Sequence, residues 1–317
     1  MSDNQVVVIL PAYNERVTIV DTILNFAKEL PKAKIIVIDN NSNDGTFELA
    51  CSTIKENNIK GEVLFESFQG KGFAMRKAFK EIDADIYIMA DADLTYQAKD
   101  VHKLMQPVIK GDADIVVGDR HSGGHYQKEN KRNFHGFGNR LVKNMINFLF
   151  KSKLNDIMSG YRVFNKKFVK NYPIMVDGFQ LETDMTLHWL DKRFVIIEIP
   201  IDFVDRPDGS VSKLNTITDG AKVIFKIFNI FRVYKPLKFY SAFFLMFSIL
   251  SLTAAYPVID DWIVHRIVYH VPLAILSTGL GIIAILSLSL GLILDAITQQ
   301  NNVNYEHNLL NTSINKE

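Results

Sequence analysis

The sequence predicts an α/β fold for the first two thirds of the chain and membrane attachment for the last third. In the first part, short apolar runs such as Val6–Leu10 alternate with segments of helical periodicity such as Thr18–Leu30. Short, continuously apolar strands separated by helices are typical of a parallel sheet with flanking helices on both faces. Near the C-terminus, Phe239–Ile259 and Val271–Leu294 contain no charged residue. We therefore expect an α/β domain joined to two transmembrane helices.

Five strands and four helices are expected before residue 120. Each strand is a short run rich in apolar residues, and a polar loop or a glycine separates it from the next helix. The predicted strands are Val6–Leu10, Lys34–Ile38, Val63–Phe65, Ile86–Ala90 and Ile115–Val117. The predicted helices are Thr18–Leu30, Gly45–Asn57, Gly72–Ile82 and Asp100–Ile109. Right-handed crossovers then place the loops that follow the strands along one edge of the sheet.

The bulk composition disfavours several classes of protein. Lys and Arg number 36 against 35 Asp and Glu, so the net charge of +1 gives no indication of a nucleic-acid partner. The single cysteine, Cys51, rules out an intrachain disulfide framework and fits a reducing compartment. The first residues lack the basic region that opens a signal peptide.

Two carboxylates at the end of a buried strand indicate a divalent-cation site. Asp91 and Asp93 flank Ala92 directly after the strand Ile86–Ala90. Hard oxygen ligands favour Mg²⁺ or Mn²⁺, and these ions commonly bridge to substrate phosphates. Open α/β sheets hold their ligands at this edge. An isolated Asp-x-Asp also occurs in solvated turns, so the prediction depends on the neighbouring loops.

The other strand-end loops carry the groups that a nucleotide–metal site needs. Carboxylates, amides, glycines and a lysine occur in Pro11–Glu15, Asp39–Thr46, Gly70–Gly72 and Gly118–Arg120. The Gly-Lys-Gly turn would bring backbone N–H groups and the Lys71 ammonium near a diphosphate. The pattern G-x-x-x-x-G-K-[ST] is absent, and no G-x-G-x-x-G follows the first strand, which disfavours a dehydrogenase.

The C-terminal third predicts an interfacial helix followed by two membrane spans. Phe239–Ile259 and Val271–Leu294 are each long enough to cross a hydrocarbon core of ~30 Å. Polar residues recur every three to four positions in Ile217–Pro236, as in an amphipathic helix at the bilayer interface. The excess of Lys and Arg before the first span places both ends of the chain in the cytoplasm. Two buried helices of a soluble domain are the alternative.

Taken together, the loops resemble those of family 2 glycosyltransferases of the GT-A fold. The resemblance rests on Pro11–Glu15, Asp39–Thr46, Gly70–Gly72 and Asp91–Asp93, in that order. Two further motifs, Asp156–Phe164 and Asp205–Lys213, are similar to the polyprenyl-phosphate branch, which includes dolichyl-phosphate mannose synthases and undecaprenyl-phosphate glycosyltransferases. The resemblance extends from about Val6 to about Leu294. It implies a Rossmann-like, mostly parallel sheet.

The resemblance implies a role for each matching residue. The nucleotide sugar would be held by Pro11, Tyr13, Glu15, Asp39, Asn40, Lys71, Asp91, Ala92 and Asp93, and Asp91 and Asp93 would bind Mg²⁺ or Mn²⁺. Most relatives have Asp where this chain has Asn40, which leaves the base contact there open. The acceptor phosphate would be bound by Arg120, Arg132, Arg206 and Lys213. The sugar and acceptor pockets would be shaped by Asn139, Asp156, Ser159, Arg162, Glu182 and Lys213. The catalytic residues would be Asp91, Asp93, Asp156 and Glu182. A purely structural Arg162–Glu182 pair is the alternative for those two residues.

The activity implied by the resemblance is metal-dependent, inverting transfer of a hexose to polyprenyl phosphate. UDP-glucose and UDP-N-acetylglucosamine are the leading donors, undecaprenyl phosphate is the acceptor if the source is bacterial, and the product would serve cell-envelope glycosylation. A phosphate monoester has its second pKa near ~6, so at neutral pH it is already a nucleophile and needs no strong general base. The alternatives are a processive polysaccharide synthase, whose Q-x-x-R-W motif is absent here, and a non-catalytic nucleotide-sugar-binding protein.

The expected organisation has four parts. Residues 1–213 form the catalytic domain, 214–236 the amphipathic interfacial helix, 237–296 the two-helix transmembrane region and 297–317 a mobile cytoplasmic tail. The protein would thus be a multi-pass protein of the cytoplasmic membrane, with its catalytic domain on the cytoplasmic side. Its expected partners are a nucleotide-sugar donor, a polyprenyl phosphate and the membrane, with no nucleic acid, and homo-oligomerisation is left open.

Overall fold

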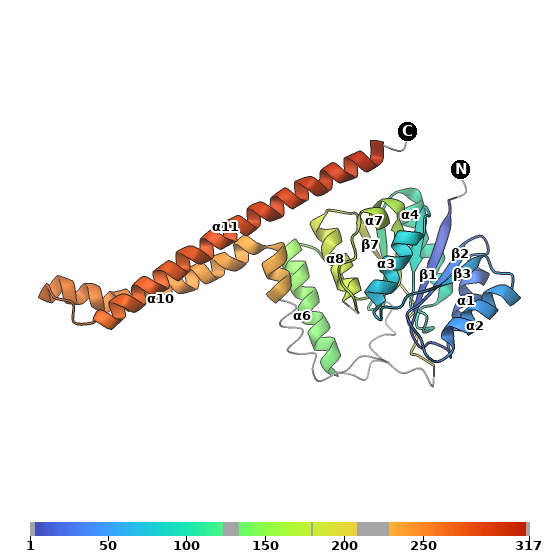
Figure 1. The fold of residues 1–317 in the computed structure, drawn as a ribbon, viewed down its shortest axis with the longest axis horizontal. Helices are drawn as coiled ribbons and strands as arrows, with labels where there is room; N and C mark the ends of the chain where they lie inside the picture. The colour runs from blue at the N-terminus through green and yellow to red at the C-terminus, as the bar shows by residue number, and fades with distance from the viewer. Residues whose placement is uncertain (1–3, 123–132, 179, 208–227, 315–317) are drawn as a thin grey trace. The chain divides into compact units, whose positions relative to one another are not determined.

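The computed structural model describes residues 4–122, 133–178, 180–207 and 228–314. The chain divides into two compact units, Met1–Ile217 and Thr218–Glu317. The first contains a sheet with its flanking helices and the second contains two long helices (Figure 1). This division lies near the boundary predicted after residue 213, and the four-part organisation itself stays a prediction.

A mixed seven-stranded sheet forms the centre of the first unit, in the order β3-β2-β1-β4-β6-β5-β7. Its strands are β1 (Val6–Ala12), β2 (Lys34–Asp39), β3 (Gly61–Phe65), β4 (Ile86–Met89), β5 (Ile115–Asp119), β6 (Arg162–Asn165) and β7 (Ile196–Pro200). All neighbours pair in parallel except β6, which is antiparallel to both β4 and β5. The mostly parallel sheet implied by the resemblance is confirmed, and the antiparallel strand β6 is an addition that the strand pattern did not predict.

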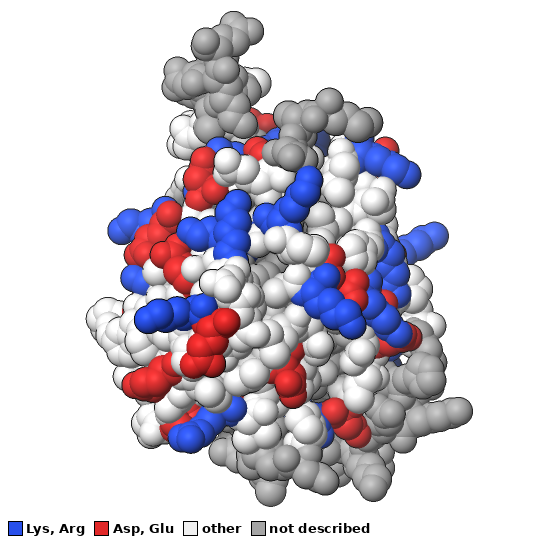
Figure 2. Space-filling model, turned by 90° about the vertical axis from the view of Figure 1, so that its right-hand side faces the viewer, with Lys and Arg blue, Asp and Glu red and all other residues white. Residues whose placement is uncertain are grey.

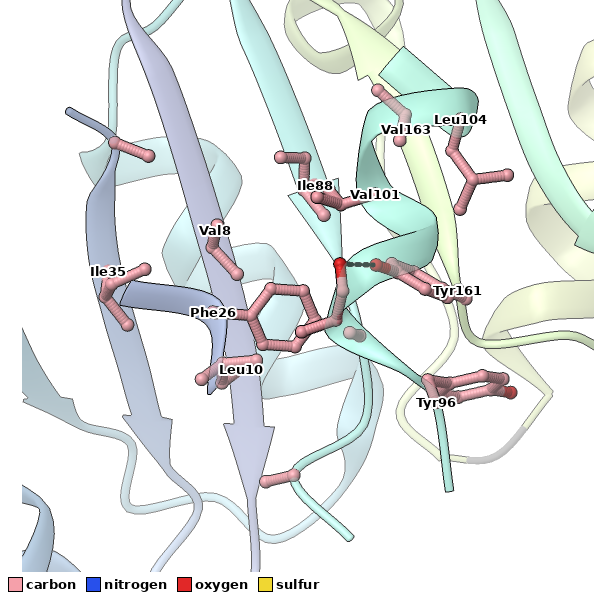
Figure 3. Packing of buried hydrophobic residues seen from close by; sticks show 14 of the residues in the cluster. Val8, Leu10, Phe26, Ile35, Ile88, Tyr96, Val101, Leu104, Tyr161 and Val163 are labelled. Atoms are coloured by element: carbon pink, nitrogen blue, oxygen red, sulfur yellow. Dashed lines mark hydrogen bonds between the residues drawn. The ribbon is translucent and has the colours of Figure 1, made fainter. Parts of the chain in front are cut away.

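Helices cover both faces of the sheet, because each central strand carries apolar side chains on both sides. These helices are α1 (Ile19–Glu29), α2 (Thr46–Glu56), α3 (Lys71–Glu81), α4 (Val101–Lys110), α7 (Lys166–Asn171) and α8 (Leu181–Asp191), with the short 3₁₀ helix η1 (Ala98–Asp100). A further helix, α6 (Asn133–Phe150), packs against α8. Figure 3 shows the first face, where Val8 and Leu10 of β1 lie near Phe26 of α1. The rings of Phe26 and Tyr161 meet edge to face at 6.0 Å.

Aromatic side chains fill the second face of the sheet. Phe164 of β6 lies 5.8 Å from Phe79 of α3, between ring centroids, and 5.1 Å from Phe168 of α7. Trp189 of α8 lies 5.5 Å from Phe168. Offset and edge-to-face ring pairs of this kind add about 0.5–1.5 kcal/mol each beyond the area that they bury. This packing holds α3, α7 and α8 against the sheet and so fixes the side chains at the ends of these helices.

The strand register gathers the functional loops at one edge of the sheet. Ala12 at the end of β1 is opposite Asp39 at the end of β2, and Met89 at the end of β4 is opposite Arg162 at the start of β6. Since β6 runs antiparallel, the loop before it reaches the edge where the parallel strands end. Asp119 at the end of β5 is opposite Pro200, so the segment after β7 begins there too.

Acidic and basic side chains are mixed over the exposed surface of the first unit. Lys34 lies 2.6 Å from Glu62, and Lys77 lies 2.8 Å from Glu81. Figure 2 shows the same mixture of signs over the face that it displays. Exposed ion pairs contribute only about 0–1 kcal/mol each to stability. The ion pairs relevant to function are therefore those between buried side chains.

The second unit is a hairpin of α10 (Pro236–His265) and α11 (Val271–Ile314). Ser251 Oγ of α10 donates to the backbone oxygen of Ser277 at 2.8 Å. The turn is closed by Asp261, whose Oδ2 accepts from the backbone N–H groups of Tyr269 at 2.8 Å and His270 at 2.9 Å. The carboxylate thus satisfies two backbone donors of the connector directly before α11 begins.

Both hairpin helices are long and apolar enough to cross a membrane. Their most apolar windows have mean hydropathies of 2.0 and 2.4, and only 0% and 11% of those windows are buried. Leu252 and Ile275, for example, each leave 70% of their surface exposed. Helices in the core of a soluble protein would bury such side chains, so this exposure disfavours the soluble alternative.

The described helical structure differs in extent from the predicted spans. α11 continues to Ile314, beyond the predicted end of the second span at Leu294. Mobility of residues 297–317 stays a prediction. Of the predicted amphipathic segment, residues 228–234 are helical, and residues 214–227 lie outside the described part of the chain.

Candidate active site

Lys71 begins α3, and its ammonium group is buried between two carboxylates. Its Nζ contacts Oδ1 of Asp91 and lies 2.5 Å from Oε1 of Glu182. Burial favours the neutral amine, but the charges of Asp91 and Glu182 outweigh burial and raise the pKa of Lys71. The Lys71 side chain therefore carries a fixed positive charge that connects the Gly-Lys-Gly turn, the Asp-x-Asp motif and α8.

The Gly-Lys-Gly turn requires its first glycine. Gly70 has a φ of 144°, and a Cβ there would lie 2.0 Å from the backbone oxygen of Asp177. The backbone N–H of Gly72 donates to that same oxygen at 2.9 Å. Only a residue without a side chain allows this close approach. The contact between the two backbone segments places Lys71 at the edge of the sheet.

Asp93 is paired with a second cation. Its Oδ2 lies 2.5 Å from Nη2 of Arg206, and Nη1 of Arg206 lies 3.7 Å from Oε1 of Glu15. Thr95 donates to Oδ1 of Asp93 from its hydroxyl at 2.6 Å. Burial and the negative charge of Asp91 raise the pKa of Asp93 against the opposing effect of Arg206. The two acids are thus close enough in space for the charge of Asp91 to affect the ionisation of Asp93.

The Asp91–Asp93 pair fits a divalent cation. The two groups are hard oxygen donors, and Asp91 is partly exposed with 30% of its side chain accessible. Among the described residues, no cluster of three or more His, Cys, Asp or Glu side chains is arranged around one point. The remaining ligands would come from water and from substrate phosphates, as is usual for Mg²⁺.

Gly160 covers the Asp91–Lys71 contact. A Cβ on this glycine would lie 2.6 Å from Oδ2 of Asp91 and 3.0 Å from Nζ of Lys71. Its backbone N–H donates to the hydroxyl of Tyr96 at 2.8 Å. The absence of a side chain at this position therefore lets the two charged groups occupy their places.

Replacing Gly160 by alanine is expected to displace the ends of Asp91 and Lys71 without unfolding the protein, because both clashing groups are ends of flexible side chains. We expect the affinity for the nucleotide diphosphate implied by the resemblance, measured with UDP and Mn²⁺, to fall about tenfold. Isothermal titration measures this affinity. The control is Gly279→Ala in α11, where no atom lies within 4 Å of the added carbon. An unchanged affinity in Gly160→Ala would contradict the placement of Gly160 against the ends of Asp91 and Lys71.

A second charge cluster is formed by Arg120 and Asp156. Nε and Nη2 of Arg120 donate to the two oxygens of Asp156 at 2.7 and 3.0 Å. Burial alone would raise the pKa of Asp156, but the charge and hydrogen bonds of Arg120 outweigh burial and lower it. The guanidinium also lies 5.4 Å from the ring of Phe203. Asp156 thus stays ionised and fixes the direction of Arg120.

Glu198 of β7 supports this pair and was missed by the sequence analysis. Its Oε1 accepts from the backbone N–H of Asp156 at 2.8 Å, and its Oε2 accepts from that of Asn155 at 2.7 Å. Burial raises the pKa of Glu198, and these hydrogen bonds oppose the rise. The signal in the sequence is an acid within the otherwise apolar run Ile196–Pro200.

Arg162 does not form the structural pair with Glu182 that was considered as an alternative. It is fully buried on β6, where its Nε donates to the backbone oxygen of Ser159 at 2.7 Å and its Nη2 to that of Ile157 at 2.8 Å. Its guanidinium lies 4.5 Å from the ring of Trp189. Burial lowers the pKa of Arg162 to about 10, so it is still charged at neutral pH. Arg162 therefore supports the turn before β6.

The two charge clusters meet at Tyr96. Burial raises the pKa of Tyr96 to about 12, and the charges of Arg120, Asp91, Lys71 and Asp156 all act on it. Tyr96 is 6% exposed, and its hydroxyl accepts from the backbone N–H of Gly160, the residue that covers the Asp91–Lys71 contact. The charges of both clusters therefore act on one buried hydroxyl.

The candidate nucleotide residues lie at the ends of β1 and β2. Asp39 is fully buried, and its Oδ2 accepts from the backbone N–H of Ser42 at 3.2 Å, while its Oδ1 has no hydrogen-bond partner. A buried acceptor of this kind fits an N–H group of a ligand.

The hydroxyl of Tyr13 accepts from Nε2 of Gln69 at 3.1 Å. The backbone N–H of Glu15 donates to Thr46 at 2.9 Å.

Both polar atoms of the Asn40 side-chain amide are hydrogen-bonded to the backbone. Its Nδ2 donates to the backbone oxygen of Phe68 at 2.6 Å, and its Oδ1 accepts from the backbone N–H of Gly70 at 2.6 Å. In this structure Asn40 therefore fixes the loop before Lys71. The base contact considered for Asn40 stays a prediction.

The remaining predicted residues are distributed as follows. Pro11 lies on β1 beside Ile38, and Ala92 accepts from the hydroxyl of Thr18 through its backbone oxygen at 2.7 Å. Ser159 is buried in the turn before β6. Asn139 lies within α6. Arg132 and Lys213 lie outside the described residues. Arg206, predicted to bind acceptor phosphate with Arg120, is paired with Asp93 in this structure, and its phosphate-binding role stays a prediction.

Comparison with known sequences identifies relatives over most of the chain. Residues 7–172 match the family described as Glycosyl transferase family 2. Glycosyltransferase AglJ of Haloferax volcanii is 30% identical over 296 residues, which cover 92% of this chain and 93% of that protein. A dolichol-phosphate mannosyltransferase of Pyrococcus furiosus is 27% identical over 232 residues, which cover 70% of this chain and 63% of that protein.

Comparison with solved structures confirms the GT-A-like fold. Glucosyl-3-phosphoglycerate synthase of Mycobacterium tuberculosis, solved in complex with Mn²⁺ and UDP-glucose, superposes with a TM-score of 0.56. The match has 18% sequence identity and covers 73% of this chain and 79% of that protein. At this level the likeness concerns the fold alone. The sequence matches confirm the family that the motifs predicted: the chain belongs to glycosyl transferase family 2 and is an enzyme that transfers a sugar.

Proposed function

We propose that this enzyme transfers a hexose from a UDP-sugar to a polyprenyl phosphate, using Mg²⁺ or Mn²⁺ and inverting the anomeric carbon. The observation that carries the proposal is the pair of charge clusters at one edge of the sheet, both acting on Tyr96, in a chain that also has two long, exposed apolar helices. The first cluster suits a nucleotide diphosphate and the second suits an acceptor phosphate. The dolichol-phosphate relative supports a lipid acceptor, and the donor class and metal proposed here are those with which the neighbour of the same fold was solved.

The donor would lie along the ends of β1, β2 and β4. Asp39 offers its unpartnered oxygen to the base, and Lys71 offers its ammonium to the diphosphate. Asp91 and Asp93 would hold a divalent cation, which stabilises the charge of the departing diphosphate when it is bound. UDP-glucose and UDP-N-acetylglucosamine are the proposed donors.

The acceptor phosphate would be oriented by Arg120. A guanidinium binds phosphate through two parallel hydrogen bonds and stays charged at any physiological pH. A phosphate oxygen then attacks the anomeric carbon while the bond from that carbon to the diphosphate oxygen breaks, and UDP leaves with the bonding electrons. The attacking oxygen carries no proton in the dianion. Asp156 therefore holds Arg120 in position and does not act as a base.

The pH dependence follows from these charges. Arg120 keeps the pKa of Asp156 below its ordinary value, so the stability that this pair contributes is present above that value and is lost only as the pH falls through the lower, folded-state pKa. The acceptor phosphate, by contrast, has a second pKa near ~6. We expect the rate to rise with pH through about 6 and then to level off.

The Asp156→Asn variant tests this assignment in pH–rate profiles of purified, folded protein. The variant is expected to be slower than the wild type, because Arg120 loses its ionic partner. The rise of its rate with pH, which we call the acid limb, is expected at the same pH as in the wild type. Disappearance of the limb in Asp156→Asn would show that Asp156 acts as the general base.

The membrane arrangement is part of the proposal. Lys235 and Lys238 lie at the start of α10, whereas the connector to α11 carries only Arg266. By the positive-inside rule, this asymmetry places the catalytic domain on the cytoplasmic side of the cytoplasmic membrane and returns the end of the chain to that side. A polyprenyl chain would then be held in the same bilayer as the two helices, and the product would serve cell-envelope glycosylation.

One assay separates the proposal from its two alternatives. The full chain, purified in detergent, is incubated with Mn²⁺, undecaprenyl phosphate and each of UDP-glucose, UDP-N-acetylglucosamine and GDP-mannose, all labelled in the sugar. We expect label in a lipid that carries one phosphate and one sugar. A long polymer would favour a processive polysaccharide synthase. No product with any donor would favour a non-catalytic binding protein.

A further inference from the structure

Each acid of the candidate metal pair is already bound to a cation of the chain itself. Asp91 contacts Nζ of Lys71, and Oδ2 of Asp93 lies 2.5 Å from Nη2 of Arg206. Both contacts are largely shielded from water, since the side chains of Lys71 and Asp93 are only 9% and 5% exposed. One oxygen of each acid, Oδ1 of Asp91 and Oδ2 of Asp93, is therefore engaged before any metal arrives.

A divalent cation alone would bind poorly beside these groups. It would have to compete with Lys71 and Arg206 for Asp91 and Asp93, and at close range it would be repelled by both positive charges. The competition is strongest where water is excluded, because screening is weakest there.

A nucleotide diphosphate supplies new partners for both cations. Its phosphate oxygens accept hydrogen bonds from an ammonium and from a guanidinium fork. Lys71 sits at the first turn of α3, where the positive end of the helix dipole also favours phosphate. Arg206 lies in a segment without regular secondary structure and has 31% of its side chain exposed, so it can change position without moving a strand or helix.

Building on the proposed function, we propose that Lys71 and Arg206 are exchangeable counter-ions. In the enzyme without substrate they hold Asp91 and Asp93, and when a nucleotide diphosphate binds they move to its phosphates and leave the two acids to the divalent cation. Metal and nucleotide therefore bind cooperatively, and the chain's own cations keep the metal affinity low until the nucleotide is present.

Binding of Mn²⁺ to the full-length protein tests the exchange, with unbound Mn²⁺ measured by electron paramagnetic resonance, with and without UDP. In the wild type, UDP is expected to strengthen Mn²⁺ binding at least about tenfold. Arg206→Met is expected to strengthen binding of Mn²⁺ alone about fivefold or more, because Asp93 loses its competing cation, and to reduce the enhancement by UDP. Arg206→Lys retains the charge and is expected to stay close to the wild type.

Two further variants are needed in the Mn²⁺-binding experiment. Lys71→Gln removes the other cation and is expected to strengthen binding of Mn²⁺ alone in the same way. Lys34→Met is the matched control, since it removes one positive charge and one ion pair at the start of β2, at the opposite edge of the sheet. Thermal melting shows which variants are folded.

The outcomes distinguish this inference from the proposed function. If folded Arg206→Met and Lys71→Gln bind Mn²⁺ alone no better than the wild type, the exchange is wrong, whether or not the enzyme transfers sugar. If strengthening also appears in Lys34→Met, it reflects overall charge, and the exchange is again wrong. If the wild type binds neither Mn²⁺ nor UDP, both the proposed function and the inference fail.

Discussion

Replacing Asp91 and Asp93 together by asparagine is expected to lower kcat/KM for sugar transfer by about a thousandfold or more, which corresponds to ~4 kcal/mol of transition-state stabilisation. The substitution keeps the volume of both side chains but removes the two charges that would hold the divalent cation. Initial rates over a range of Mn²⁺ concentrations measure the effect, and raising the concentration is not expected to restore the rate.

The double variant should stay folded, because Lys71 keeps Glu182 as a partner and Arg206 keeps Glu15 nearby. The matched control is Asp83→Asn, which removes a carboxylate that is 65% exposed and paired with Lys166 before the start of β4. Its activity is expected to equal that of the wild type. If the double variant retained a tenth or more of the wild-type activity, Asp91 and Asp93 would not bind a divalent cation that sugar transfer requires.

Replacing Arg120 by lysine is expected to lower kcat/KM for the lipid acceptor about a hundredfold, or ~3 kcal/mol. Lysine keeps the charge but has no planar fork, so it loses the bidentate contact with Asp156 and the bidentate grip on a phosphate. The KM for the nucleotide sugar is expected to change little. Kinetics with each substrate varied in turn measure the two effects separately.

Arg76→Lys is the matched control for this substitution. Arg76 lies on α3, where its side chain is 42% exposed and 3.6 Å from Asp177, so losing its fork should leave both kinetic parameters near those of the wild type. If Arg120→Lys raised the KM for the donor and for the acceptor equally, Arg120 would belong to a general anion site and not to the acceptor phosphate.

The sheet was predictable where local pattern determines the structure. All five expected strands form. Four of them are apolar runs that the sheet buries on both faces, as in Val8–Leu10 and Ile35–Ile38, whereas β3 is a partly exposed edge strand. The two missed strands depend on distant partners. β6 is four residues long, begins with Arg162 and lies between β4 and β5, and no local pattern predicts an antiparallel insertion there. β7 is an edge strand and is only partly buried.

The candidate site was predictable in its residue types but not in its pairings. The order of strand-end loops placed Asp91, Asp93 and Lys71 at one edge, and the structure brings all three together. The partners are set by the packing of later elements. Arg206 pairs with Asp93 because the segment after β7 crosses that edge, and Glu198 could be recognised only once β7 had a position beside β5.

The central claim is that the acceptor is a phosphate monoester oriented by Arg120 and needing no general base. It is tested most directly by giving the wild-type enzyme undecaprenyl phosphate and undecaprenol side by side, with the same labelled UDP-sugar and Mn²⁺. The account predicts a lipid-linked sugar from the phosphate, at least about a thousandfold faster than from the alcohol, which has no negative charge for Arg120 to hold and must lose a proton. Equal transfer to both lipids, or transfer to the alcohol alone, would contradict it.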